Sequence, residues 1–298
     1  MKKLLEGGHF YEGPRWHNGY WYVSDLYAHE VLKISVTGDA QVVATVPGQP
    51  SGLGWLPDGD LLVVSMKDRK IMKVNPQGVL TEHADIYQHT GFYANDMVVS
   101  GPGYAYVGNL GFNLFEGDAP CTAAIVKVSP EGGVSIAATD LLFPNGMVIT
   151  PDGKTLIVAE TLGARLSAFT IGDNGELSDH RIWAEVGKAP PMTSAETLAD
   201  TDFAPDGCTL DAEGCVWLAD AFHGRVARVK EGIGIVEEIK APEGMGLYSC
   251  ALGGENGNEL LICTAPDFDD VKRSARKEAV LYTVKVDVPA ADFQRAEQ

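Results

Sequence analysis

The chain has 298 residues, of which 45% are apolar, and its 41 acidic and 23 basic side chains give a formal net charge of −18. No apolar run approaches the roughly 18 residues that a membrane-spanning helix needs, and the composition is that of a folded protein, which excludes membrane-spanning and disordered classes. The negative charge would repel phosphates, so nucleic acid and anionic membrane surfaces are not expected partners. The length is compatible with two domains or with one large repetitive domain.

The N-terminal segment and the cysteines bear on the cellular compartment in which the protein is expected. The first eight residues, MKKLLEGG, contain an apolar stretch too short for a secretory signal. The five cysteines have no CxxC spacing, and their odd number argues against a complete disulfide framework. We therefore expect a cytoplasmic protein with reduced thiols.

Six segments share one pattern, in which a short strand, a tight glycine turn and a second β-branched or aromatic strand are followed by a third strand. In chain order they cover residues 12–25, 51–66, 95–109, 145–160, 206–220 and 248–265. Their start-to-start spacings of 39, 44, 50, 61 and 42 residues suit four-stranded propeller blades. Because long helical periodicity is absent and a β-sandwich would not need the same turn six times, the repeats predict an all-β, six-bladed β-propeller.

This propeller would form a single domain over residues 1–298, with the segment Lys3–Phe10 adding a strand to the last blade. Glycine makes up 34 of the 298 residues, about 11% against a usual share of about 7%, as expected for many tight turns. Four long insertions, at residues 83–94, 110–122, 185–204 and 266–277, should all fall on one face. Long loops on a rigid framework commonly carry binding and catalysis.

The first residues of the repeats should meet around the central channel on that face. They form a ring of Glu12, Ser51, Asn95, Asn145, Asp206 and Tyr248. The two carboxylates and two asparagines of this ring predict a divalent cation site, because converging carboxylates repel each other unless a cation lies between them. Oxygen-only ligands favour Ca²⁺, with Mg²⁺, Mn²⁺ or Zn²⁺ as alternatives. Each residue alone could be structural, since Asn-Gly and Asp-Gly pairs are common in turns.

Four of these segments resemble one known family, the senescence marker protein (regucalcin), gluconolactonase and luciferin-regenerating-enzyme-like family. The resemblance covers nearly the whole chain and is carried by the runs Glu12–Trp16, Asn95–Val98, Pro144–Met147 and Pro205–Gly207. It implies a six-bladed propeller with a divalent cation held by Glu12, Asn145 and Asp206, and with Asn95 as an additional pocket residue. It also implies a small-molecule substrate, a sugar lactone.

Lactone opening needs a polarised carbonyl and an activated water, which a cation and an adjacent carboxylate supply. Asp206 is the predicted catalytic base, and direct nucleophilic attack by Asp206 is the competing mechanism. No GxSxG motif is present that would indicate a serine hydrolase. A promiscuous esterase or organophosphate hydrolase and a non-catalytic calcium-binding propeller remain alternatives, and the sequence leaves the oligomeric state open.

Further residues are predicted to contact the substrate. Asn109 and Glu160 end two of the second strands and are predicted, with Asn95, to hydrogen-bond substrate hydroxyls. Phe112, on a long loop, is predicted to cover a ring-shaped ligand. Arg15 lies on the opposite face of its strand from Glu12, which favours a structural ion pair.

Overall fold

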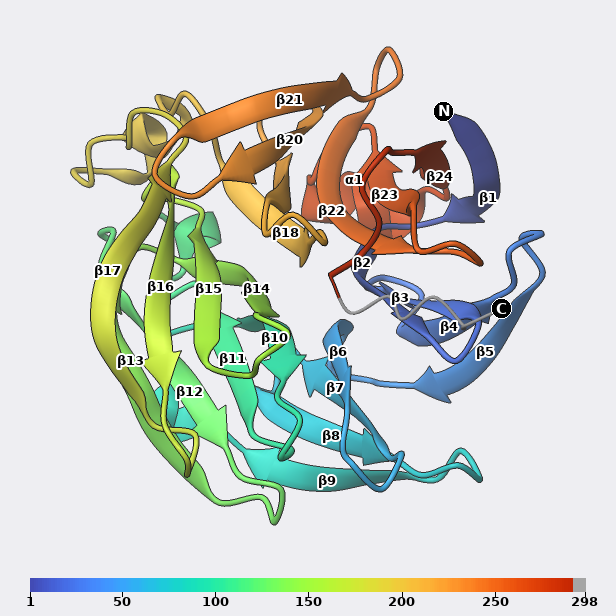
Figure 1. The fold of residues 1–298 in the computed structure, drawn as a ribbon, viewed down its shortest axis with the longest axis horizontal. Helices are drawn as coiled ribbons and strands as arrows, with labels where there is room; N and C mark the ends of the chain where they lie inside the picture. The colour runs from blue at the N-terminus through green and yellow to red at the C-terminus, as the bar shows by residue number, and fades with distance from the viewer. Residues whose placement is uncertain (292–298) are drawn as a thin grey trace.

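The computed structural model describes residues 1–291; residues 292–298, which the predicted domain includes, lie outside the described part of the chain. Six four-stranded antiparallel sheets are arranged in a ring (Figure 1). The prediction of an all-β, six-bladed propeller is therefore confirmed.

Each of the first five sheets is built from four consecutive strands. The first two contain β2 (Tyr11–His17), β3 (Tyr20–Asp25), β4 (Glu30–Ile34) and β5 (Ala40–Thr45), then β6 (Pro50–Trp55), β7 (Leu61–Ser65), β8 (Lys70–Val74) and β9 (Leu80–Asp85). The next two contain β10 (Ala94–Val99), β11 (Ala105–Asn109), β12 (Ala123–Val128) and β13 (Val134–Leu141), then β14 (Pro144–Ile149), β15 (Thr155–Glu160), β16 (Arg165–Ile171) and β17 (Leu177–Glu185). The fifth contains β18 (Pro205–Leu210), β19 (Val216–Asp220), β20 (Arg225–Lys230) and β21 (Gly234–Lys240).

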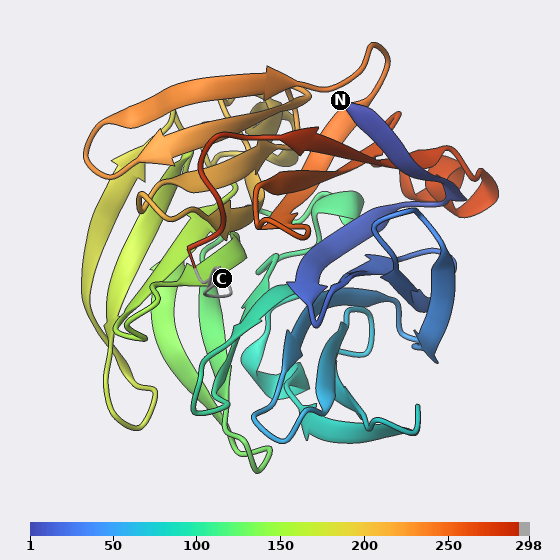
Figure 2. The same cartoon turned by 45° about the vertical axis from the view of Figure 1, so that its right-hand side comes forward.

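The sixth sheet joins the two ends of the chain and so closes the ring. Its order from the axis outwards is β22 (Gly246–Gly253), β23 (Glu259–Ala265), β24 (Ala279–Lys285) and β1 (Lys2–Gly8). The N-terminal strand β1 pairs antiparallel with β24, and the two lie side by side in both views (Figures 1 and 2). Hydrogen bonds from the start of the chain thus hold its last blade.

Burial falls from the axis outwards, which explains the residue types along each blade. Second strands such as β7 and β11 are buried at every residue, whereas the fourth strands β5 and β9 are mostly exposed. The core lies between adjacent sheets: Leu62 and Val64 of the second sheet pack in one cluster with Met97 and Val107 of the third. The β-branched and aliphatic residues of the repeats are therefore the packing surface between blades.

The face opposite the long loops carries short turns that explain part of the glycine excess. Gly59 and Gly153 have φ angles of +92° and +71° in the turns that link first and second strands, and glycine adopts such angles without strain. The long loops contain the 3₁₀ helices η1 (Tyr87–His89), η2 (Leu114–Glu116) and η3 (Ala195–Ala199) and the short helix α1 (Asp270–Ala275). Across residues 1–291, no helix is long and apolar enough to cross a membrane.

Candidate active site

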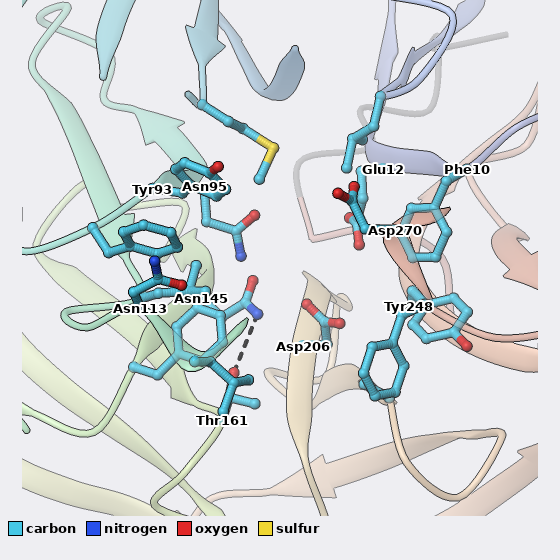
Figure 3. Close-up of a pocket in the computed structure, with 18 of the residues that line it drawn as sticks. Phe10, Glu12, Tyr93, Asn95, Asn113, Asn145, Thr161, Asp206, Tyr248 and Asp270 are labelled. Carbon is cyan, nitrogen blue, oxygen red and sulfur yellow. Dashed lines mark hydrogen bonds between the residues drawn. The ribbon is translucent and has the colours of Figure 1, made fainter. Parts of the chain in front are cut away.

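A pocket of about 310 Å³ opens on the face that carries the long loops. All four predicted insertions contribute to its lining, for example through Phe92, Phe112, Leu198 and Phe268. Glu12, Asn95, Asn145 and Asp206 also line the pocket and point towards one another (Figure 3). The structure thus brings the four residues of the predicted ligand set into one cavity.

Irregular strand pairing aims these side chains at the axis. Every innermost strand has a register shift beside its ring residue, so that pairing with the second strand is interrupted where the strand enters the pocket. Such bulges re-aim side chains away from simple alternation. For the four site residues the shifts lie between Glu12 and Arg15, Ala94 and Met97, Pro144 and Met147, and Pro205 and Cys208.

The glycines that follow the site residues allow the innermost strands to come close together. A Cβ at Gly146 would lie 2.4 Å from the carbonyl oxygen of Asp206, and a Cβ at Gly207 would lie 1.8 Å from Ser249 Oγ. Neither distance is compatible with any larger residue without a shift of the neighbouring strand. The Asn145-Gly146 and Asp206-Gly207 pairs therefore lie within strands at a point of close approach and not in turns.

Hydrogen bonds orient the two asparagines differently. Asn145 Nδ2 donates to Thr161 Oγ1 (3.1 Å), and Thr161 in turn donates to the carbonyl oxygen of Pro205 (2.6 Å) (Figure 3). The amide oxygen of Asn145 is thereby left for the pocket, as a metal ligand requires. Asn95 Oδ1 instead accepts a hydrogen bond from Ser51 Oγ (3.1 Å), so its amide nitrogen remains as a donor towards a ligand.

Burial and neighbouring negative charges destabilise the charged forms of both carboxylates. Removal from bulk water raises the pKa of Asp206 to about 8, with the charge of Asp96 as the next cause, while hydrogen bonds from Asn145 and Gly207 act in the opposite direction. Burial also raises the pKa of Glu12 well above its ordinary value, and the charges of Asp206 and Asp96 add to this effect. A bound cation would remove this penalty.

Asp96 is a buried acid beside the site that the sequence reasoning missed. Its Oδ1 accepts hydrogen bonds from Arg15 Nη2 (2.8 Å) and from the backbone amide of Met97 (2.7 Å), while its Oδ2 is buried without a hydrogen-bond partner. The structural ion pair predicted for Arg15 is present. The sequence did contain a signal for Asp96. Glycine follows four of the ring residues, Glu12, Ser51, Asn145 and Asp206, whereas the residue after Asn95 is Asp96.

The ligand set fits a hard cation. Within residues 1–291, no three His, Cys, Asp or Glu side chains lie close enough together to hold a metal. The site instead offers the carboxylates of Glu12 and Asp206 and the oriented amide oxygen of Asn145. Such an oxygen-only set suits Ca²⁺ and leaves positions for water or substrate, and it has none of the sulfur or imidazole that zinc favours.

Asn109 and Glu160 are placed differently from the prediction. Neither lines the pocket, and both side chains are fully buried. Glu160 accepts a hydrogen bond from the backbone amide of Leu142 (2.8 Å) and pairs with Arg165 (2.8 Å), and Asn109 Nδ2 donates to the carbonyl oxygen of Ala124 (2.7 Å). These two side chains fix loops and strands within the protein, and neither is placed to contact a ligand in the pocket.

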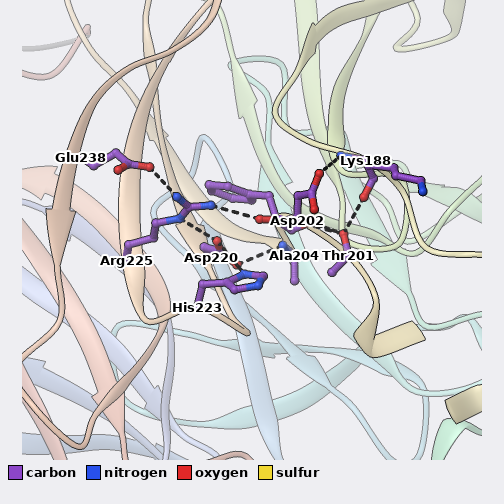
Figure 4. Close-up of polar contacts among 9 residues, drawn as sticks. Lys188, Thr201, Asp202, Ala204, Asp220, His223, Arg225 and Glu238 are labelled. Atoms are coloured by element: carbon purple, nitrogen blue, oxygen red, sulfur yellow. Dashed lines mark hydrogen bonds and ion pairs between the residues drawn. The ribbon is translucent and has the colours of Figure 1, made fainter. Parts of the chain in front are cut away.

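The fifth blade shows the same arrangement at the end of its second strand (Figure 4). Asp220 accepts a hydrogen bond from the backbone amide of Ala204 (3.0 Å) and pairs with Arg225 (2.8 Å) and His223 (2.9 Å). Arg225 also bonds Glu238 (2.6 Å) on the outermost strand. An acid at this repeat position therefore anchors the segment that enters its own blade, which explains why polar residues recur there.

Aromatic side chains form much of the pocket wall. Phe112, predicted to cover a ligand, lines the pocket and is itself buried. The rings of Phe92 and Tyr93 stack with centroids 4.0 Å apart. Phe10 and Phe268 also line the pocket and were not singled out from the sequence, although Phe268 lies on the predicted insertion 266–277.

A comparison with known families identifies the group to which this site belongs. The profile of the family described as "SMP-30/Gluconolactonase/LRE-like region" matches residues 10–266. The chain belongs to this family. The match includes all four residues of the predicted ligand set, and the family is the one that the sequence motifs resembled.

Sequence similarity to individual relatives is low, and the length of chain that it covers differs between them. The chain is 25% identical to an uncharacterised protein of Sulfolobus acidocaldarius over 288 residues, 96% of this chain and 95% of that protein. It is 23% identical to the 6-deoxy-6-sulfogluconolactonase of Pseudomonas putida over 171 residues, 55% of this chain and 53% of that enzyme, so the match spans about half of the lactonase.

A solved structure in the family has the same fold. The calcium-binding protein regucalcin from Agrobacterium tumefaciens superposes with a TM-score of 0.74 at 21% identity, covering 97% of this chain and 92% of that one. At this identity the likeness establishes the shared propeller, and the function of this chain has to be argued from its own site.

Proposed function

We propose that this chain is a divalent-metal-dependent hydrolase that opens a lactone ring, with its active site around Glu12 and Asp206. The observation that carries this proposal is the meeting of two desolvated carboxylates with the oriented amide oxygen of Asn145 at the base of a pocket. The family description and the name of the Pseudomonas putida relative support lactone opening. The sugar lactone predicted from the sequence is one member of this substrate class.

Glu12, Asn145 and Asp206 would hold the cation, and Ca²⁺ is the preferred ion, in keeping with the calcium-binding relative from Agrobacterium tumefaciens. A bound cation would polarise the lactone carbonyl and stabilise the negative charge that develops on its oxygen. The two carboxylates would then be ionised at neutral pH, because the opposite charge reverses the rise in their pKa values.

The residues of the chain supply the remaining steps. Asp206 accepts a proton from the attacking water as the new carbon–oxygen bond forms, and it returns that proton to the leaving ring oxygen as the ring carbon–oxygen bond breaks, which gives a hydroxy acid. The amide nitrogen of Asn95, held by Ser51, donates a hydrogen bond to a substrate oxygen. In the competing mechanism Asp206 itself attacks the carbonyl carbon. A single turnover in ¹⁸O-water separates the two, because only nucleophilic attack leaves label in the Asp206 carboxylate.

The assay is acid release on a panel of lactones, carboxylic esters and phosphotriesters, before chelation, after chelation and with Ca²⁺ restored. We expect lactone opening that is lost with chelator, restored by Ca²⁺ and abolished in Asp206→Asn. Asp58→Asn, in an exposed turn on the opposite face, is the matched control and should retain full activity. Turnover that survives chelation would refute the proposal.

Two other results of the same panel would assign a different function. Faster hydrolysis of esters or phosphotriesters than of any lactone would identify the promiscuous esterase or organophosphate hydrolase. Tight Ca²⁺ binding without turnover on any compound would identify a non-catalytic calcium-binding propeller.

A further inference from the structure

We propose that the preferred substrate of this pocket is an uncharged lactone that carries a hydrocarbon substituent, rather than a polyhydroxylated or anionic sugar lactone. This inference rests on the proposed function and concerns the substrate class of the same site. It follows from the walls of the pocket, because the carboxylates at the base would serve any lactone.

One wall is a continuous series of aromatic rings that runs outwards past the carboxylates. Neighbouring ring centroids are 6.4 Å apart for Tyr27 and Phe10, 4.7 Å for Phe10 and Tyr248, 6.3 Å for Tyr248 and Phe268, and 5.8 Å for Phe268 and Phe222. Phe222 and Phe268 are 36% and 49% exposed, so the series ends in solvent at the rim. Contiguous exposed aromatic surface of this kind marks a site for an apolar ligand.

The other side of the pocket is also apolar. Phe112, Leu162 and Leu198 form a buried cluster against which Phe143 packs, and all four residues line the cavity. A hydrocarbon substituent would therefore contact carbon on both sides and lose no hydrogen bonds on entering.

Hydroxyl groups of a sugar would find few partners on these walls. At the base, Asn145 Nδ2 and the Thr161 hydroxyl donate within the protein and Asn95 Oδ1 accepts from Ser51, which leaves the Asn95 amide nitrogen for an oxygen of the lactone itself rather than for a substituent. A hydroxyl buried against aromatic carbon gives up its bonds to water without replacement, which lowers affinity. The pocket therefore selects against substituents rich in hydroxyl groups.

The charge of the lining excludes anionic substituents. Among the lining residues in the described part of the chain there is no Lys, Arg or His, whereas Glu116 and Asp270 add two acids to Glu12 and Asp206. Both added acids are exposed, which places them near the rim (Asp270 is labelled in Figure 3). A divalent cation would balance only the two carboxylates at the base. A phosphate, sulfonate or carboxylate on the substrate would thus meet repulsion and no partner.

The test compares kcat/KM of the Ca²⁺-loaded protein for four lactones: δ-decalactone, dihydrocoumarin, glucono-δ-lactone and 6-phosphoglucono-δ-lactone. We expect the alkyl and aryl lactones to exceed gluconolactone by at least about tenfold, the scale on which one apolar group is discriminated, and the phosphorylated lactone to react most slowly. Gluconolactone or its phosphate reacting fastest would overturn the substrate class while leaving the proposed function intact. Hydrolysis of none of the four would instead overturn the proposed function.

A binding measurement tests the same inference without turnover. Calorimetry on wild-type protein should detect 6-pentyl-δ-lactam, a slowly hydrolysed analogue of δ-decalactone, and should show no comparable binding of the polyhydroxylated gluconolactam. In Phe268→Ser, the ratio of kcat/KM for δ-decalactone over unsubstituted δ-valerolactone should fall about tenfold. Tyr20→Ser, at an exposed aromatic residue outside the pocket, should leave this ratio unchanged. An unchanged ratio in Phe268→Ser, or tighter binding of gluconolactam, would overturn the proposal.

Discussion

Replacing Asp206 by asparagine is expected to change how the stability of the metal-free protein depends on pH. In the folded chain the pKa of Asp206 is raised from 3.8 to about 8, because its carboxylate is desolvated beside Asp96. The unfolded chain releases this proton near pH 4 and the folded chain retains it, so the free energy of unfolding falls as pH rises from about 4 to about 8. At about 1.4 kcal/mol per pKa unit, the rise from 3.8 to about 8 corresponds to a full loss of about 6 kcal/mol.

The asparagine variant cannot ionise at this position, so its free energy of unfolding should fall much less between about pH 4 and about pH 8. In chelator, it should match wild type near pH 4 and be more stable by several kcal/mol at pH 8, on the order of the shift above. Saturating Ca²⁺ should reverse the order at pH 8, since only wild type retains both carboxylates for the ion. The assay is urea unfolding from pH 4.5 to 8.5, with exposed Asp58→Asn as the control that follows wild type. Parallel pH profiles for wild type and Asp206→Asn would refute the electrostatic reasoning.

Two substitutions and one labelling reaction test the packing and burial of residues around the site. Gly207→Ala should destabilise the fold by about 3 kcal/mol or more in urea unfolding, because its Cβ would lie 1.8 Å from Ser249 Oγ. Glu160→Gln should lower the free energy of unfolding by about 2 kcal/mol, because it removes the negative charge from an ion pair with the partly exposed Arg165. The same substitution should leave KM unchanged. A thiol reagent should label only Cys121 of the five cysteines in the folded protein, because the other four are buried.

Each of these has a defined opposing result. Gly153→Ala is the control for backbone strain without crowding, because Gly153 has a φ of +71° and an added Cβ there would meet no atom within 4 Å beyond its chain neighbours. Equal destabilisation by Gly207→Ala and Gly153→Ala would contradict the packing argument. A large rise in KM for Glu160→Gln would restore its substrate-binding role. Rapid labelling of two or more thiols would contradict the burial of the cysteines.

The propeller could be predicted from the sequence because its blades repeat the same local chemistry. Glycines such as Gly59 and Gly153 lie in turns that need positive φ, and the buried second strands repeat the same apolar and β-branched residues. Equivalent repeat positions meet at the axis of a closed ring, so Glu12 and Asp206 could be placed together although 194 residues separate them. The repeat symmetry was therefore enough to predict that these two residues, distant in the sequence, lie close together in the fold.

Other features depended on geometry that strand periodicity does not contain. Bulges in the innermost strands change which side chains face the axis, and close strand approach at Gly146 and Gly207 looks like turn chemistry in the sequence. Glu160 was expected to face a ligand because it ends a strand on the functional face. Glu160 instead accepts a hydrogen bond from the backbone amide of Leu142, and this contact depends on how the loop before β14 folds back. Such loop conformations are set by packing that the sequence pattern does not show.

The rate of lactone opening by chelated protein, as Ca²⁺ is restored stepwise, tests the central claim most directly. Wild type should be inactive after chelation and recover fully as the site fills, while Glu12→Gln should recover little at the same Ca²⁺ concentrations. A rate that chelation does not change, or full recovery in Glu12→Gln, would contradict a metal-dependent active site at the centre of the propeller.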